Sequence, residues 1–186
     1  PTLRRDIVTP RFLIVVAKVA VRLNISPSLL AATMYGEINS RWLKDDIEDG
    51  AVDDVRKCRR VCGIFERAGS LLGNQLIDSD NTFGPAKIKP SAILDSEVTI
   101  PVLTANGIVV PASPADAAIQ ALDFETSVTY AGAYLKGLAD IRKGDSPGSG
   151  HRFFDLSFVD KQIIRVAYTE GLGKFKSLCG GSLTCY

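Results

Sequence analysis

The feature that most constrains the fold is a helix-start signal in which a Ser or Thr is followed directly by Pro. The signal occurs at Thr9-Pro10, Ser26-Pro27 and Ser113-Pro114. The hydroxyl oxygen can cap the first turn, and Pro at the first helical position has no N–H to leave unpaired. Apolar residues recur at helical spacing after these signals, so we expect helices over residues 10–23, 27–39 and 113–142. A further helix over 158–170 is expected to end at Gly171.

The segments between these helices are expected to be shorter and more polar. Residues 44–69 are dense in charge and predict one or two solvent-exposed helices. Gly69, Gly73 and the polar run 78–81 indicate a loop. Residues 90–94 are expected to form a turn or a short helix.

Residues 95–112 are predicted to form a β-hairpin insertion. Two apolar runs flank Asn106-Gly107, a dipeptide typical of two-residue hairpin turns. Pro101 and Pro111 would confine both strands to the edge of a sheet. The expected fold class is therefore mainly α, with one small β element and no internal repeat.

Length and composition fit a single domain over residues 1–186. The chain is 46% hydrophobic and 23% charged, which is typical of a globular protein that can bury a core of its own. A net charge of +1 gives no reason to expect a nucleic-acid partner. Lys18 and Arg22 interrupt the apolar run 12–23, which argues against a membrane span and a signal peptide. The single histidine, His151, excludes metal sites that need several imidazoles.

The four cysteines are Cys58, Cys62, Cys179 and Cys185. Their even number permits two disulfides, and two local loops are the simplest interpretation because the members of each pair are close in sequence. Disulfides would place the protein in an oxidising compartment, either a periplasm or the outside of a cell. The alternatives are a zinc site of four thiolates, whose spacings fit zinc ribbons poorly, and free buried thiols in a cytosolic protein.

Glu37 is the most informative residue of the chain. It shares a helix face with Leu30, Thr33 and Met34, so its carboxyl group is expected to be partly desolvated. Desolvation raises the pKa of a carboxyl group, and so does the negative end of the helix dipole. A carboxylic acid that stays protonated near neutral pH can act as a general acid. The alternative is a glutamate at a helix end that simply reaches water.

Two further segments bring polar and aromatic side chains together. Residues 78–88 hold two carboxylates, an amide and an aromatic ring around a glycine. Such a loop can approach a ligand closely and offer it hydrogen bonds and a stacking face. Residues 167–171 place a Tyr and a Glu at a helix end. Taken alone, each segment is compatible with an ordinary turn or helix end.

Taken together and in this order, the three segments resemble the goose-type lysozyme and soluble lytic transglycosylase superfamily. That family has an apolar helix ending in a catalytic Glu, a G-[LP]-[MA]-Q-[IV] loop, and an A-Y-N-x-G motif at a late helix end. The matching segments are SPSLLAATMYGE at 26–37, NTFGPAKI at 81–88 and VAYTEG at 166–171. The resemblance implies a lysozyme-like (α+β) helical domain with insertions near 44–77 and 95–112.

The resemblance also implies a role for each matching residue. Glu37 would be the general acid, and Asp78 or Asp80 would position a water molecule. Tyr168 would support Glu37 or line the groove. Further residues expected to bind substrate are Asn81, Phe83, Gly84, Lys87, Thr169 and Glu170. No metal or other cofactor is implied.

The chain departs from the family pattern at four positions. Lys87 stands where the family loop has Gln, and Ile38 stands where Ser or His commonly follows the Glu. Thr169 replaces the Asn of the last motif, and Lys89 falls where goose-type enzymes carry a second acid. These differences bear on the substrate contacts and on the choice between a hydrolase and a transglycosylase.

The implied substrate is the β-1,4 glycan of peptidoglycan, cut between N-acetylmuramic acid and N-acetylglucosamine. With Asp78 or Asp80 holding a water opposite Glu37, the enzyme would be an inverting hydrolase, a muramidase. With Glu37 alone it would be a lytic transglycosylase that forms 1,6-anhydro products. The alternatives are a non-catalytic helical module that binds glycan or a partner protein, and a chitinase of related fold.

The biological setting is expected to be secreted or periplasmic. The chain would act as a processed protein or as a lytic domain of a larger exported protein, such as an antibacterial effector or a phage component. The expected partners are peptidoglycan strands and, for an effector, a specific immunity or inhibitor protein. These expectations about the setting rest on analogy.

Overall fold

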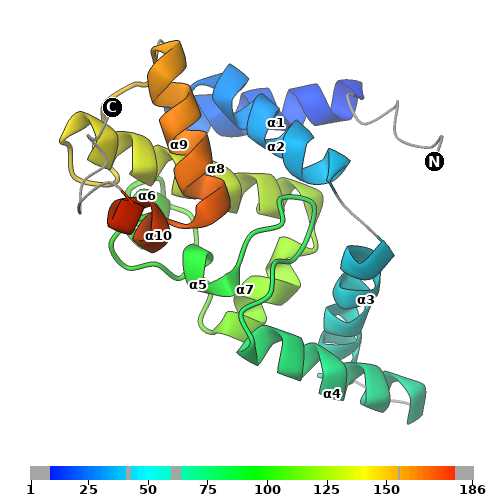
Figure 1. The fold of residues 1–186 in the computed structure, drawn as a ribbon. Helices are drawn as coiled ribbons and strands as arrows, with labels where there is room; N and C mark the ends of the chain where they lie inside the picture. Colours follow the sequence, from blue (N-terminus) through cyan, green and yellow to red (C-terminus); the bar gives the residue numbers. More distant parts are fainter. Residues whose placement is uncertain (1–8, 41–42, 60–63, 155, 179–186) are drawn as a thin grey trace.

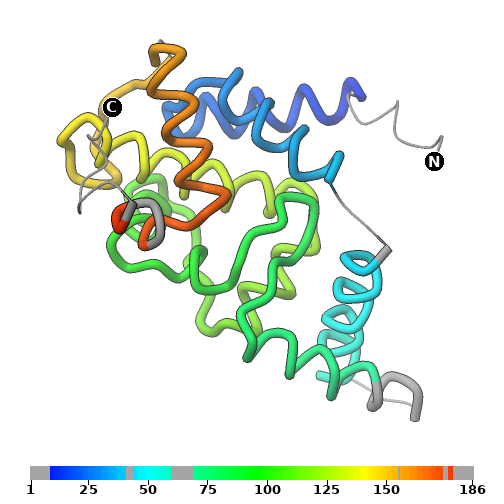
Figure 2. The backbone as a smooth tube through the Cα atoms, viewed as in Figure 1, coloured from blue at the N-terminus to red at the C-terminus, as the bar shows by residue number. Residues whose placement is uncertain are grey.

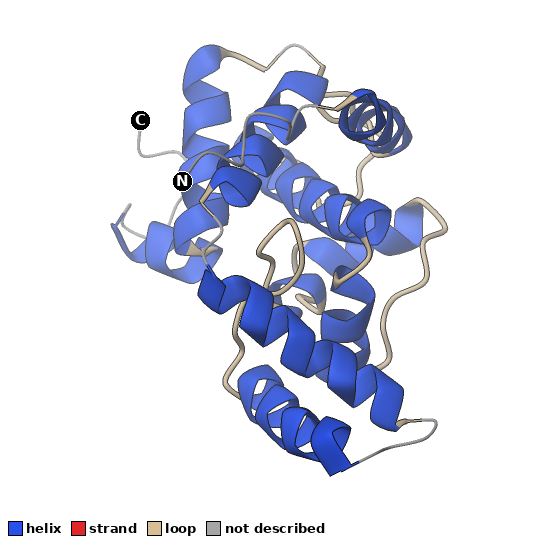
Figure 3. Cartoon of the chain, turned by 90° about the vertical axis from the view of Figure 1, so that its right-hand side faces the viewer, coloured by secondary structure: helices blue, strands red, loops and turns tan. Residues whose placement is uncertain are grey.

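The computed structural model describes residues 9–40, 43–59, 64–154 and 156–178, and this part of the chain is mainly helical (Figures 1 and 3). Within it the extended pairings are two isolated β-bridges, Ile25 with Phe153 and Phe83 with Ile88. The helices are α1 (Pro10–Arg22), α2 (Pro27–Asn39), α3 (Leu43–Cys58), α4 (Ile64–Asp78), α5 (Pro90–Ile93), α6 (Thr99–Ala105), α7 (Pro114–Ala121), α8 (Phe124–Lys143), α9 (Phe158–Glu170) and α10 (Leu172–Leu178).

The three predicted helix starts are confirmed. The side chains of Thr9, Ser26 and Ser113 each accept the backbone N–H of the residue three positions on, and each is followed by Pro in the first turn. Gly171 follows the last residue of α9 with a φ of 83°, as expected for a glycine that ends a helix. Among the described helices, none is both long enough and apolar enough to cross a membrane.

Helix α8 forms the centre of the fold. It is buried continuously from Ser127 to Asp140, which is the pattern of a helix surrounded by others. In Figure 1 helices α1 and α2 lie above it and α9 crosses in front of it. Two glycines permit the close contacts, because a Cβ on Gly132 would press against Leu23 of the α1 region and a Cβ on Gly137 would meet the backbone of Val98.

The single helix predicted over 113–142 is wrong, since the structure has two helices there. Helix α7 ends at Ala121, and Asp123 begins α8 as its N-cap. The Asp123 carboxylate accepts the backbone N–H of Thr126 at 2.9 Å. A side chain that hydrogen-bonds its own backbone competes with helix continuation, which explains the break.

The β-hairpin predicted over 95–112 is also wrong, because Thr99–Ala105 form helix α6. Pro101 lies in the first turn of α6, where its missing N–H costs nothing. Asn106 and Gly107 end this helix instead of turning a hairpin. Gly107 has a φ of 61°, and the N–H groups of Gly107 and the next residue bond back to carbonyls inside α6 at 3.1 and 2.9 Å. This is the Schellman pattern of a helix C-terminus.

Helices α3 and α4 form a helical hairpin that projects from the rest of the molecule (Figures 1 and 3). Gly69 and Gly73, predicted to lie in a loop, are inside α4. A Cβ at Gly73 would collide with the backbone of Ala51, and one at Gly69 would collide with the side chain of Asp54. Gly69 and Gly73 therefore permit α3 and α4 to pack closely against each other. The segment near 44–77 forms this projecting helical hairpin, the α3–α4 arm.

A buried ion pair holds the connector that follows α8, residues 144–150, against the core. The Lys136 ammonium lies 2.5 Å from the Asp140 carboxylate, and both side chains are almost fully buried. Asp140 also accepts the Gly148 N–H at 2.9 Å and the Ser149 hydroxyl at 2.7 Å. Because a buried carboxylate needs such partners, these bonds fix residues 144–150 to the core.

Candidate active site

Glu37 lies in the last turn of α2. The preceding turn is buried through Thr33 and Met34, while Glu37 itself is partly exposed. One hydroxyl in this turn, that of Thr33, is buried without a hydrogen-bond partner. The predicted position of Glu37 on a mostly apolar helix face is thus confirmed.

Burial and three neighbouring charged groups set the pKa of Glu37. Partial burial raises the pKa of its carboxyl group above the ordinary value of 4.5, and this is the largest effect. The ammonium of Lys87 and the guanidinium of Arg165 lower it, and the carboxylate of Asp45 raises it. The net result is a raised pKa, so the protonated form of Glu37 persists to a higher pH than that of an exposed glutamate.

The loop that faces Glu37 is a tight turn between two paired residues. Phe83 and Ile88 exchange backbone hydrogen bonds of 3.0 and 3.2 Å. Gly84 and Lys87, inside the turn, have φ values of 69° and 47°. A Cβ on Gly84 would collide with the backbone carbonyl of Ala121. Glycine is therefore required here for contact with the protein's own backbone rather than for approach to a ligand.

Three other elements hold this loop in place. Figure 2 shows the loop rising toward the end of α2. The carboxylate of Asp49 on α3 accepts the Gly84 N–H at 2.9 Å. The hydroxyl of Ser127 on α8 accepts the Ala86 N–H at 3.0 Å. The hydroxyl of Tyr168 on α9 donates to the Ala86 carbonyl at 2.8 Å. The loop is thus fixed relative to Glu37 by α3, α8 and α9.

A cleft of 280 Å³ opens between the end of α2, this loop and the end of α9. It brings together the predicted residues Glu37, Lys87, Tyr168, Thr169 and Glu170. These five come from three segments that are far apart in the sequence. The other lining residues are Thr82, Ile88, Lys89, Ala92, Tyr134 and Gly171.

Two tyrosines form one side of the cleft. The ring centroids of Tyr134 and Tyr168 lie 5.8 Å apart, and the Tyr134 hydroxyl accepts the Leu172 N–H at 3.2 Å. Burial raises the pKa of both hydroxyls, that of Tyr168 well above 10.0, and the negative charge of Glu37 adds to the effect on Tyr168. Tyr168 therefore stays neutral and keeps its proton for the bond to the loop.

The two predicted water-positioning carboxylates lie elsewhere. Asp78 is exposed at the last position of α4 and does not line the cleft. Asp80 accepts the backbone N–H and the hydroxyl of Ser91 at 2.9 and 2.6 Å, and its carboxylate is 3.7 Å from the Lys89 ammonium. Asp80 thus caps the start of α5 and reaches the cleft only through Lys89.

Three predicted substrate contacts have structural roles instead. Phe83 is only 1% exposed, so its ring offers no stacking face. Gly84 is buried against Ala121. The Asn81 side chain donates to the Leu76 carbonyl at 3.2 Å and so completes the end of α4. The predictions for these three residues are corrected because they build the loop that carries the cleft residues.

Several residues at the cleft were not predicted as site residues. Asp45 lies on the α3–α4 arm, 3.3 Å from the Lys87 ammonium. Arg165 lies beside Gly36, where a Cβ would touch its guanidinium. Tyr134 and Lys89 line the cleft directly. The one local sequence feature that relates to Arg165 is Gly36, directly before Glu37, because a side chain there would touch the guanidinium. The contact between Asp45 and Lys87 depends on how the α3–α4 arm packs.

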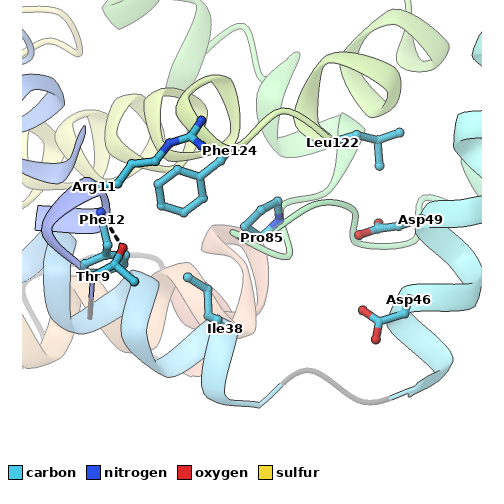
Figure 4. Close-up of a pocket in the computed structure, with 9 residues that line it drawn as sticks. All are labelled: Thr9, Arg11, Phe12, Ile38, Asp46, Asp49, Pro85, Leu122 and Phe124. Atoms are coloured by element: carbon cyan, nitrogen blue, oxygen red, sulfur yellow. Dashed lines mark hydrogen bonds between the residues drawn. The ribbon is translucent and has the colours of Figure 1, made fainter. Parts of the chain in front are cut away.

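A second cavity has a volume of 530 Å³, and Figure 4 shows the residues that line it. Ile38 and Pro85 line it on one side, and Asp46 and Asp49 of α3 line it on the other. Its remaining lining residues are Thr9, Arg11, Phe12, Leu122 and Phe124. Ile38 directly follows Glu37, so the end of α2 contributes to both cavities.

The described residues contain no group of three or more His, Cys, Asp or Glu side chains placed to hold a metal ion. Cys58 is the one cysteine among them, and it does not carry a free thiol. Cys62, Cys179 and Cys185 lie outside the described residues, and the predicted pairing therefore stays a prediction.

Comparison with known proteins adds no relative. No family model, no curated protein and no solved structure matches the chain. Fold and site together define a mainly helical protein with one half-buried glutamic acid in a cleft between α2, the loop at 82–89 and α9.

Proposed function

We propose that the protein is a muramidase, a hydrolase that cuts the β-1,4 bond between N-acetylmuramic acid and N-acetylglucosamine in peptidoglycan. The observation that carries the proposal is Glu37, a carboxylic acid with a raised pKa that lines a cleft. The resemblance to goose-type lysozymes and lytic transglycosylases supports it, since all three resembling segments contribute to that one cleft.

In the first step of the proposed reaction, Glu37 is the general acid. Its carboxyl proton passes to the glycosidic oxygen as the bond from that oxygen to the anomeric carbon of N-acetylmuramic acid breaks. The leaving sugar departs with a neutral 4-hydroxyl, and the anomeric carbon becomes electron-poor. A raised pKa favours this step because the acid must be protonated at the working pH.

In the second step of a hydrolase, a water attacks the anomeric carbon and loses a proton to a carboxylate. Asp78 and Asp80 were the candidates from the sequence, but they do not line the cleft with Glu37. Glu170 does line it, at the end of α9. We therefore add Glu170 as the candidate that positions the water, with Asp80 acting only through Lys89.

A lytic transglycosylase is the second candidate. It is favoured by the observation that Asp78 and Asp80 lie outside the cleft. In that reaction the sugar's own C6 hydroxyl attacks the anomeric carbon, and the Glu37 carboxylate takes the hydroxyl proton. The product is a 1,6-anhydro ring, and Glu37 returns to its protonated state without a second acid.

Digestion of purified peptidoglycan tests the proposal. We expect the protein to release soluble muropeptides, and mass spectrometry of their ends separates the two reactions. Reducing ends indicate a muramidase, and 1,6-anhydro ends indicate a transglycosylase. Glycan binding without any release would contradict the proposal and favour the non-catalytic binding module. Cleavage of chitin oligomers but not peptidoglycan would favour the chitinase.

A further inference from the structure

Two cations lie near Glu37 without pairing with it. The ammonium of Lys87 and the guanidinium of Arg165 both lower the pKa of the Glu37 carboxyl group, so their charges act on it through space. In the described part of the chain, however, neither cation forms an ion pair with Glu37. A general acid must be protonated, and a direct ion pair with a lysine would hold its carboxyl group ionised. The position of the Lys87 ammonium therefore bears on whether Glu37 can act as an acid.

The Lys87 ammonium is held by the α3–α4 arm and by the end of α2. It lies 3.3 Å from the carboxylate of Asp45, in the first turn of α3, and 3.5 Å from the backbone carbonyl of Ser40. The side chains of Lys87 and Asp45 are only 18% and 14% exposed. Breaking a largely buried ion pair is costly, because separation leaves each charge without its partner. Asp45 therefore fixes where the positive charge lies.

The backbone at Lys87 is held in an uncommon conformation. Its φ of 47° lies in the left-handed region, which a residue with a side chain rarely adopts. The Lys87 N–H bonds to the Gly84 carbonyl at 3.0 Å, and the pairing of Phe83 with Ile88 closes the turn. Such conformations persist where the surrounding contacts fix them, and they are common at functional sites. The turn thus leaves the lysine side chain as the movable part, and Asp45 restrains it.

The same arm makes a second contact with the loop. Asp49, four residues after Asp45 on α3, accepts the Gly84 N–H at 2.9 Å. Residues four apart lie on the same face of a helix, so one face of α3 directs both carboxylates to the loop. Asp49 contacts the backbone of the loop, whereas Asp45 contacts its charged side chain. A substitution at Asp45 can therefore release the ammonium while Asp49 still holds the loop.

We propose that Asp45 is a positioning residue for the general acid, because it retains the Lys87 ammonium on the arm and so keeps it from forming an ion pair with Glu37. This inference rests on the proposed function, in which Glu37 donates a proton. Without Asp45 the ammonium loses its partner, and the Glu37 carboxylate in the same cleft can replace it. The arm thereby controls the acid, although no described residue of the arm lines the cleft.

Other ionisable groups also lie around Glu37, and they stay constant when Asp45 is changed. Arg165 lies beside Gly36, and Lys89 has a carboxylate partner in Asp80. The further ionisable groups that line the cleft are Tyr134, Tyr168 and Glu170. An effect of Asp45 that acts through Lys87 must therefore largely disappear when Lys87 is replaced by a neutral residue.

The titration midpoint of the Glu37 carboxyl group, measured by carbon-13 NMR on the full chain, tests this inference. Asp45→Asn should move the midpoint to lower pH and reduce the protonated fraction at a given pH about tenfold, the effect of an opposite charge brought next to a carboxyl group. Asp45→Ser is a second neutral variant if the first does not fold. Asp45→Glu keeps the charge and should keep the midpoint. Lys87→Gln should raise the midpoint, and adding Asp45→Asn to it should have a much smaller effect than Asp45→Asn alone.

Asp53→Asn is the matched control on the same helix. Asp53 also pairs with a lysine, since its carboxylate lies 2.9 Å from the Lys57 ammonium, but it does not contact the loop. This substitution removes the same charge from α3 and should leave the midpoint of Glu37 unchanged. In the digestion assay, Asp45→Asn should lower the rate at neutral pH about tenfold and move the high-pH limb of the rate profile to lower pH. A thermal melt of each variant establishes that it is folded.

The outcomes separate this inference from the proposed function. An unchanged midpoint in the folded Asp45→Asn or Asp45→Ser protein overturns the inference, and so does an equal fall in the Lys87→Gln background. If the midpoints move as expected but the unsubstituted protein releases no muropeptides, the coupling between Asp45 and Glu37 stands and the proposed function fails. If the unsubstituted protein digests peptidoglycan while the Asp45 variants keep its midpoint, the proposed function stands and the inference fails.

Discussion

The hydroxyl of Tyr168 donates a 2.8 Å hydrogen bond to the backbone carbonyl of Ala86, and this bond links two segments that lie 82 positions apart. It ties the end of α9 to the loop that carries Lys87. Glu37, Lys87 and Tyr168 all line the same cleft. This buried hydrogen bond therefore helps to set the position of the loop that carries Lys87 relative to Glu37, the proposed acid.

Tyr168→Phe removes only the hydroxyl that makes this bond. We expect the free energy of unfolding to fall by about 1–3 kcal/mol, because the Ala86 carbonyl loses a buried donor. Peptidoglycan cleavage should fall as well, since the loop is no longer fixed to α9. Chemical denaturation and a digestion assay measure the two effects. Unchanged stability and unchanged cleavage would contradict the role assigned to this bond.

Gly84→Ala tests the close approach of the loop to α7. Gly84 combines a φ of 69° with a position where a Cβ would collide with the Ala121 carbonyl. We expect a loss of more than about 2 kcal/mol, from backbone strain and overpacking together.

Gly144→Ala is the matched control for this substitution. Gly144 has a φ of 80°, but nothing lies within 4 Å of its Cβ position. It should cost about 1–2 kcal/mol, the penalty of a left-handed backbone alone. Equal losses at Gly84 and Gly144 would show that contact with Ala121 is not the cause.

Asp160 fixes the start of α9 to the end of α8. Its carboxylate lies 3.0 Å from Arg142 and 2.5 Å from Lys143, and it accepts the Ser157 hydroxyl at 2.8 Å. The bond to Lys143 is the main reason that the pKa of Asp160 falls from 3.8 to about 2. A depressed pKa stabilises the folded state above the unfolded value, and this contribution is lost as the pH falls through the folded value.

Asp160→Asn should therefore destabilise the protein by at most about 2 kcal/mol at neutral pH, since Lys143 is partly exposed to solvent. The difference from the unsubstituted protein should shrink as the pH falls from 3.8 toward about 2. Thermal melts across this range measure it. A difference that does not depend on pH would mean that the carboxylate charge contributes nothing.

The position of the second carboxylate is tested by three substitutions. Glu170→Gln should slow cleavage strongly if the protein is a muramidase, because Glu170 lines the cleft with Glu37. Asp78→Asn should have little effect, because Asp78 is exposed and does not line the cleft. Asp80→Asn should have an intermediate effect through Lys89 and α5. Digestion rates measure all three, and full activity in Glu170→Gln together with reducing ends would place the water elsewhere.

The local signals in the sequence predicted most of the helices. Thr9, Ser26 and Ser113 cap helices because the hydroxyl and the following Pro act within one turn. The same kind of local signal was ambiguous at Asn106-Gly107. An Asn-Gly pair supplies a positive φ, which suits both a hairpin turn and a helix end, and packing of α6 on α8 decides between them.

The site could be predicted only in part. The partly buried position of Glu37 follows from a helix face, which is a local feature, whereas a role for Tyr168 was implied only by the resemblance. The tertiary contacts were not predictable. Gly84 has the local sequence features of a ligand-binding glycine, but the Ala121 carbonyl lies against it. Asp45 reaches Lys87 only because the α3–α4 arm folds back beside the loop. Nothing near Asp45 in the sequence indicates that contact.

Glu37→Gln is expected to leave the protein folded and at least as stable at neutral pH. A raised pKa means that the ionised carboxylate of Glu37 is less favourable in the folded state than in the unfolded state. The stabilising preference for the protonated form is present below 4.5 and is lost as the pH rises through the folded value. Removing the charge should thus raise the melting temperature at neutral pH or leave it unchanged.

The rate of muropeptide release from purified peptidoglycan by the Glu37→Gln protein tests the central claim most directly. We predict a fall of about 10²–10⁴-fold, the contribution of a general acid. Glu97→Gln, at an exposed glutamate outside the cleft, should retain the full rate. Release by the folded Glu37→Gln protein at the rate of the unsubstituted protein would contradict the assignment of Glu37 as the catalytic acid.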